Sequence, residues 1–123
     1  MRSHVDLDVW KRAVDLAADV YKVTAKYPAD EKFGLVSQMR RASVSIASNI
    51  AEGAARTSNR EFQQFLSIAS GSASELGTQL VISRRIAIGD DLSLSNLEQS
   101  VDKVSQMIRG LIRAVRNRDS GNP

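Results

Sequence analysis

Four stretches of this sequence place apolar residues three or four positions apart, and no stretch alternates with the period of two that a strand requires. Such spacing puts apolar side chains along one side of an α-helix and leaves its other side polar. Proline, which interrupts helices, occurs only at residues 28 and 123, so almost the whole chain is free to be helical. The sequence therefore predicts an all-α fold.

Three breaks divide this pattern into four predicted helices, at about residues 7–26, 33–55, 59–88 and 95–117. Pro28 ends the first helix, because the residue before a proline avoids the helical conformation. Ser58, with Glu61 three residues later, forms the sequence signature of a capping box at the start of the third helix. Ser95 and Glu98 repeat this signature at the fourth helix. Gly89 and the two aspartates after it mark the turn between these helices.

Four amphipathic helices joined by short connections are typical of an antiparallel up-down-up-down four-helix bundle. The chain has 123 residues, which is the size of one domain. We therefore predict a single bundle domain at residues 1–118, followed by a disordered tail at residues 119–123. Because the core of such a chain is small, association into a homo-oligomer is also expected.

The residue types argue against several classes of function. The chain contains no cysteine and a single histidine, His4, so cysteine chemistry and a histidine-based triad or zinc site are not expected. The Glu-x-x-His pairs of di-iron bundles are also absent. No apolar run approaches the ~18 residues of a membrane span. We expect a cytoplasmic protein that needs no metal or cofactor, does not enter a membrane and is not an enzyme.

The second predicted helix has an unusual polar side. At 100° per residue its apolar residues share one arc, which holds Leu35, Val36, Met39, Ala42, Ile46, Ala47 and Ile50. The opposite arc holds Arg41, Ser45, Ser48, Asn49, Glu52 and Arg56. Serine and asparagine are mediocre helix formers, whereas a solvated face more often carries Glu, Lys and Gln.

This polar stripe has three interpretations: a solvated surface, a packed contact or a catalytic site. Catalysis is disfavoured because the stripe has no nucleophile with a base beside it. Small polar side chains let another backbone approach closely and form hydrogen bonds across the contact. We interpret the stripe as a polar seam, within the bundle or between subunits, formed by Arg41, Ser45, Ser48, Asn49 and Glu52. Gly71 and Gly77 lie inside the third predicted helix, where glycine is unfavourable. Their presence predicts that another helix crosses closely at these positions.

Basic residues gather toward the end of the chain. Arg109, Arg113 and Arg116 are spaced to share one side of the fourth helix, where they also favour the helix dipole and solubility. In an up-down bundle this end lies beside the turn between the second and third helices and the start of the first. We therefore predict a nucleic-acid-binding surface made of Arg12, Arg56, Arg60, Arg109, Arg113 and Arg116. Aromatic residues are scarce, which favours contact with the phosphate backbone over base stacking.

Two long stretches, "YPADEKFGLVSQMRRASVSIASNIAEGAAR" (27–56) and "FLSIASGSASEL" (65–76), carry a family resemblance. They resemble the four-helix-bundle proteins encoded in intervening sequences of bacterial 23S ribosomal RNA genes, over roughly residues 7–115. The resemblance implies a bundle that assembles into a ring-like homopentamer. The chain is more distantly similar to the accessory variability protein of diversity-generating retroelements, which implies binding of nucleic acid and reverse transcriptase.

Taken together, these features lead us to expect a non-enzymatic, homo-oligomeric bundle that binds RNA or DNA through a basic end. The alternative is a protein-interaction scaffold in which grooves of the ring bind a partner protein or helix.

Overall fold

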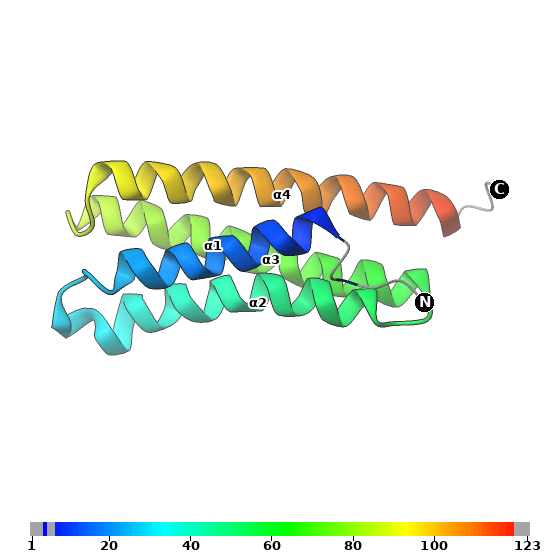
Figure 1. Ribbon diagram of the computed structural model, residues 1–123, viewed down its shortest axis with the longest axis horizontal. Coiled ribbons are helices and arrows are strands. Elements are labelled where there is room, and N and C mark those ends of the chain that lie inside the picture. The colour runs from blue at the N-terminus through cyan, green and yellow to red at the C-terminus, as the bar shows by residue number, and fades with distance from the viewer. Residues whose placement is uncertain (1–3, 5–6, 120–123) are drawn as a thin grey trace.

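The computed structural model describes His4 and residues 7–119, and every long element in this part is a helix. The four helices are α1 (Asp8–Thr24), α2 (Ser37–Ala54), α3 (Asn59–Arg85) and α4 (Asp91–Asp119). Figure 1 shows them side by side, with successive helices running in opposite directions. Each helix packs against the next, and α1 also packs against α4, which closes the bundle. The prediction of an all-α, four-helix fold is confirmed.

The core lies along the bundle axis, where the apolar stripes of all four helices meet. Its fully buried large side chains include Leu16 of α1, Ile46 of α2, Leu66 of α3 and Ile108 of α4. Burying one such side chain contributes about 1.5–3 kcal/mol, so the stripes are the main source of stability.

The connection between α1 and α2 is more structured than the sequence indicates. A 3-10 turn, η2 (Ala29–Glu31), is followed by a π-helical turn, η3 (Lys32–Val36). Gly34 is not helical there (φ −104°, ψ −107°), which explains why α2 begins at Ser37 and not at residue 33. The connection is fixed to α3 by Tyr27, which is buried and donates a hydrogen bond to Ser83 Oγ at 2.8 Å.

α2 and α3 pack closely where the end of α2 meets the start of α3. A Cβ atom at Gly53 would lie 2.8 Å from Cβ of Phe65 and 2.9 Å from Cδ1 of Phe62, so only glycine fits. The prediction for Gly71 is wrong, because a Cβ atom there would meet nothing within 4 Å. At Gly77 the nearest atom would be 3.9 Å away, an ordinary contact that does not require glycine.

One of the two predicted capping boxes forms in the structure. Ser58 caps α3, since its Oγ accepts a hydrogen bond from the backbone N–H of Glu61 at 3.1 Å. The box at Ser95 is not formed, because α4 begins four residues earlier, at Asp91. The carboxylate of Asp90 accepts from the N–H of Ser93 at 3.0 Å and so provides an earlier cap.

Candidate functional site

The predicted polar seam is divided between a helix contact and the surface. Ser45 Oγ lies 2.8 Å from Ser72 Oγ of α3, and Asn49 Nδ2 donates to Ser45 Oγ at 3.0 Å. These residues form a seam within one chain, between α2 and α3. Arg41, Ser48 and Glu52 are exposed, so three of the five predicted residues lie outside this contact.

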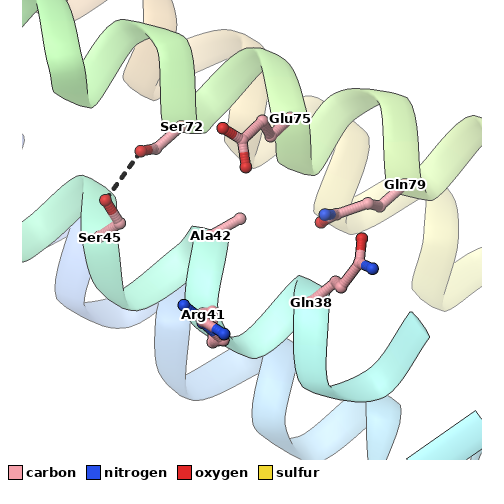
Figure 2. Close-up of a pocket in the computed structure, with 7 residues that line it drawn as sticks. All are labelled: Gln38, Arg41, Ala42, Ser45, Ser72, Glu75 and Gln79. Atoms are coloured by element: carbon pink, nitrogen blue, oxygen red, sulfur yellow. Dashed lines mark hydrogen bonds between the residues drawn. The ribbon is translucent and has the colours of Figure 1, made fainter. Parts of the chain in front are cut away.

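Beside the hydroxyl pair, α2 and α3 form a polar groove of about 380 Å³. Figure 2 shows the residues that line it, which are Gln38, Arg41, Ala42, Ser45, Ser72, Glu75 and Gln79. All of these residues except Gln79 belong to the two stretches that carry the family resemblance. Those two stretches therefore face each other across this groove. We call it the α2–α3 groove.

Sequence reasoning missed the α3 side of this groove, although a signal was present. Ser72, Gln79 and Ser83 are polar, yet they follow Ala69 and Leu76 at the spacing of the buried stripe of α3. All three are buried in the structure. Polar residues on an apolar stripe are costly to bury, so they mark a place where a hydrogen-bonding arrangement is built into the packing.

The predicted nucleic-acid-binding residues are brought together in part. The C-terminal end of α4 and the turn between α2 and α3 lie at the same end of the bundle (Figure 1). We define the basic end by its exposed arginines: Arg60, Arg109, Arg113, Arg116 and Arg118.

Two predicted members are placed differently. Arg56 is half-buried, lies over the ring of Phe65 at 4.9 Å and bonds to Glu52 at 2.8 Å, so its charge is partly used within the fold. Arg12 lines a separate groove between α1 and α4, together with Asp15, Asp19 and Lys103. Its location there follows from the short α1, whose first turns lie beside the middle of α4 and not beside its end.

From Lys103 to Arg118 of α4 no acidic residue interrupts the basic end, although Glu61 beside Arg60 adds a negative charge to it. Glu52 is held by Arg56, and the carboxylate of Glu61 accepts a hydrogen bond from Ser58 Oγ at 3.3 Å. Within the described part of the chain, Arg60, Arg109 and Arg113 form no ion pair.

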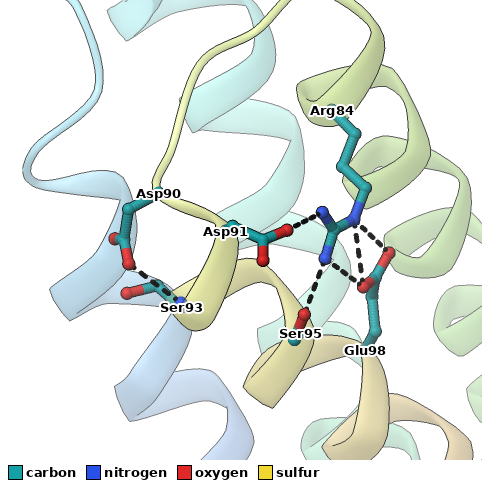
Figure 3. A network of polar contacts seen from close by, with 6 residues as sticks. All are labelled: Arg84, Asp90, Asp91, Ser93, Ser95 and Glu98. Carbon is teal, nitrogen blue, oxygen red and sulfur yellow. Dashed lines mark hydrogen bonds and ion pairs between the residues drawn. The ribbon is translucent and has the colours of Figure 1, made fainter.

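At the opposite end, which holds the α1–α2 and α3–α4 connections, Arg84 forms a network of paired charges. Arg84 donates to Asp91, to Ser95 at 2.8 Å and to Glu98 at 2.8 Å (Figure 3). Hydrogen bonds from Arg84 lower the pKa of Glu98, and hydrogen bonds to Glu98 and Asp91 raise the pKa of Arg84. The hydrogen bonds of Ser93 lower the pKa of Asp90. We call this the connection end.

No group of three or more His, Cys, Asp or Glu side chains that can hold a metal ion occurs among His4 and residues 7–119. Over the same residues, no helix has both the length and the apolar character that crossing a membrane requires.

These features define the class of protein, a closed four-helix bundle with a polar α2–α3 groove and one basic end. The family model described as 23S rRNA-intervening sequence protein matches residues 5–110, and the chain belongs to this family. A search of curated proteins finds no match.

A solved structure has the same fold. It is a protein with unknown function from the S23 ribosomal protein family of Bacteroides thetaiotaomicron. The two structures superpose with a TM-score of 0.75 at 22% sequence identity, over 85% of this chain and 95% of the other. This similarity supports the arrangement of the helices.

Proposed function

We propose that the protein is a non-enzymatic, homo-oligomeric bundle that binds the phosphate backbone of RNA or DNA through its basic end. The observation that carries the proposal is the set of exposed arginines at that end, of which Arg60, Arg109 and Arg113 form no ion pair in the described part of the chain. Since Arg60, Arg109 and Arg113 are not paired within the described part of the chain, their charges are available to phosphate groups.

The side chains around the basic end favour backbone contact over base recognition. Phe62 is buried, and the ring of Phe65 is covered by Arg56. Phe33, which is 88% exposed, lies in the connection between α1 and α2, at the other end of the bundle. Without exposed aromatic rings near the arginines, stacking on single-stranded bases is not expected. Binding should therefore depend weakly on sequence and strongly on salt.

Assembly is part of the proposal, because one basic end offers few phosphate contacts. The family resemblance implies a ring of five chains, which would multiply the contacts. Each phosphate neutralised steepens the salt dependence of the binding constant by about 0.9 in the double-logarithmic slope. Light scattering at micromolar concentration should give a mass several times the 13.5 kDa of the chain. A mass near 13.5 kDa would remove the assembly from the proposal.

The binding experiment compares two triple variants with the same net charge. One carries Arg109→Glu, Arg113→Glu and Arg116→Glu at the basic end, and the other carries Lys22→Glu, Lys32→Glu and Arg85→Glu away from it. Each changes the net charge from +3 to −3 (3 − 6 = −3). Fluorescence anisotropy with labelled RNA and DNA duplexes and single strands, over a salt series, measures affinity.

We expect the basic-end variant to lose about 100-fold in affinity at low salt and the salt slope to fall by about 3, while the control changes far less. Absence of binding by the natural protein at low salt, or equal losses in both variants, would show that the basic end is not the binding surface.

A partner protein is a second candidate, favoured by apolar side chains on the α1–α2 side of the bundle. Val14, Tyr21 and Val44 are 40%, 44% and 42% exposed, and Tyr21 and Val44 line one shallow pocket. Exposed apolar patches often mark protein contacts. Affinity capture after nuclease treatment, followed by Tyr21→Lys and Val44→Lys substitution, tests this: a specific partner should be recovered with the natural protein and lost with the variant.

A further inference from the structure

The α2–α3 groove contains a buried hydrogen-bonding group that the fold does not use. The side chain of Gln79 lines the groove and is 93% buried (7% exposed), and its Oε1 atom has no hydrogen-bond partner among the described residues. A buried carbonyl oxygen without a donor destabilises a fold, so native structures usually supply one. The amide of Gln38 lies across from Gln79 (Figure 2) and is exposed, which leaves it free to turn and open access to this oxygen.

The rim of the groove carries two opposite charges that are also unused. Arg41 on α2 and Glu75 on α3 both line it, and Figure 2 shows the Glu75 carboxylate directed into the space between the helices. Both side chains are exposed, and neither takes part in an ion pair within His4 and residues 7–119. Unused charges of both signs in one groove suit a ligand that carries both signs.

The acceptors and donors of the groove define that ligand more closely. Glu75 and Gln79 Oε1 present acceptors only, which match an ammonium group with three N–H donors and no acceptor. The guanidinium of Arg41 matches a carboxylate, to which it can donate two parallel hydrogen bonds. The methyl group of Ala42 lies between α2 and α3 in the same groove, and the hydroxyl pair of Ser45 and Ser72 lies at one end of it (Figure 2).

We propose that the α2–α3 groove binds a small zwitterion of the α-amino acid class, with its ammonium group at Glu75 and Gln79 and its carboxylate at Arg41. The volume of about 380 Å³ is at the lower end of the range for small-molecule sites. Nucleotides fit less well, because Glu75 would repel their phosphates and no aromatic side chain lines the groove to stack on a base.

The first experiment uses the full chain and matched ligands. Each of the twenty common amino acids is added at millimolar concentration, and the melting temperature and amide NMR resonances are followed. For any amino acid that binds, its N-acetyl derivative, which lacks the ammonium group, and its carboxamide, which lacks the carboxylate, are tested alongside. We expect saturable binding of at least one amino acid and binding at least about tenfold weaker for both derivatives.

The second experiment changes the groove. Gln79→Met, Glu75→Gln and Arg41→Gln should each weaken binding about tenfold or more, whereas Asp102→Asn, the same kind of change on the exposed surface of α4, should leave it unaltered. Gln79→Met should also raise the melting temperature of the unliganded protein, because it removes an unsatisfied buried group. A raised melting temperature together with weaker binding would show that Gln79→Met has lost the ligand and not the fold.

Three outcomes would overturn the proposal. In the first, no amino acid changes the melting temperature or the NMR spectrum. In the second, the derivatives bind as well as the parent zwitterion. In the third, the groove variants change the mass of the assembly in light scattering without changing amino acid binding, which would assign the groove to a contact between copies of the chain.

Discussion

The two ends of the bundle use charge in opposite ways. At the connection end, Arg84 joins α3 to the first turns of α4 by hydrogen bonds to Asp91, Ser95 and Glu98. At the basic end, the arginines of α4 are exposed, and the contact between α2 and α3 is made by Gly53 against Phe62 and Phe65. The helices are therefore held together partly by polar contacts at the connection end and by close side-chain packing at the basic end. Arg60, Arg109 and Arg113, which form no ion pair among the described residues, are the charges most readily assigned to a ligand.

The largest effect should come from breaking the steric fit at the basic end. In Gly53→Leu, the new side chain would meet Phe65 and Phe62 at distances below 3 Å, so the helices must separate. We expect a loss of about 3 kcal/mol in the free energy of unfolding, measured by urea denaturation.

Gly71→Ala is the matched control on α3. Its Cβ atom would meet nothing within 4 Å, so only the higher helix propensity of alanine remains. The variant should gain about 0.5–1 kcal/mol. If Gly53→Leu were as stable as the natural protein, the α2–α3 contact would not have the close geometry described.

A smaller loss is expected from the turn that precedes α4 at the connection end. Gly89 has φ +80°, and a Cβ atom there would lie 3.2 Å from both Leu94 and Tyr27. Gly89→Ala should therefore cost about 1–2 kcal/mol in the free energy of unfolding, from left-handed backbone strain. Equal stability of the two proteins in the same urea titration would contradict this reading of the turn.

The smallest effect on stability should come from removing the polar contacts of Arg84, and this effect should depend on pH. The pKa of Glu98 is lowered in the folded protein, chiefly by its hydrogen bonds from Arg84. A lowered folded-state pKa adds stability above the unfolded value of about 4.3 and loses it as pH falls through the folded value. Arg84→Met should thus be slightly less stable than the natural protein at about pH 6, and the difference should shrink as the pH falls through the lowered pKa of Glu98.

Arg85→Met provides the comparison for this pH series, because Arg85 is exposed and forms no ion pair in the described part of the chain. Its difference from the natural protein should not change with pH over this range. A difference for Arg84→Met that stays undiminished as the solution is acidified would mean that the contacts to Glu98 and Asp91 are not its source.

The helices were predictable because their signal is local. Apolar spacing indicates where a helix runs, and Ser58 indicates where α3 begins. The start of α4 was placed too late because two adjacent segments offer competing caps. The structure uses Asp90, while Ser95 and Glu98 bind Arg84 on another helix. These contacts are tertiary, and the sequence of the fourth segment alone does not reveal them.

The candidate sites were predictable only in part, because periodicity indicates which residues share a face but not what lies against it. Ser45 and Ser48 were placed on one arc, yet Ser45 meets Ser72 and Ser48 is exposed. Likewise, Gly71 and Gly77 were predicted to lie at close helix crossings, whereas Gly53 makes the close contact between α2 and α3. Arg12 was assigned to the basic end because the sequence does not show where the start of α1 lies along α4, and the structure places Arg12 beside Lys103.

The position of the C-terminal end of α4 beside the exposed arginines has a practical consequence for anyone handling the protein. A label or affinity tag fused beyond α4 starts within reach of those arginines, so immobilisation through it would press that surface against the support. Since the chain has no cysteine, Asp30→Cys in η2 would create a single attachment point at the far end. A sensor surface coupled there would leave the arginines facing the solution.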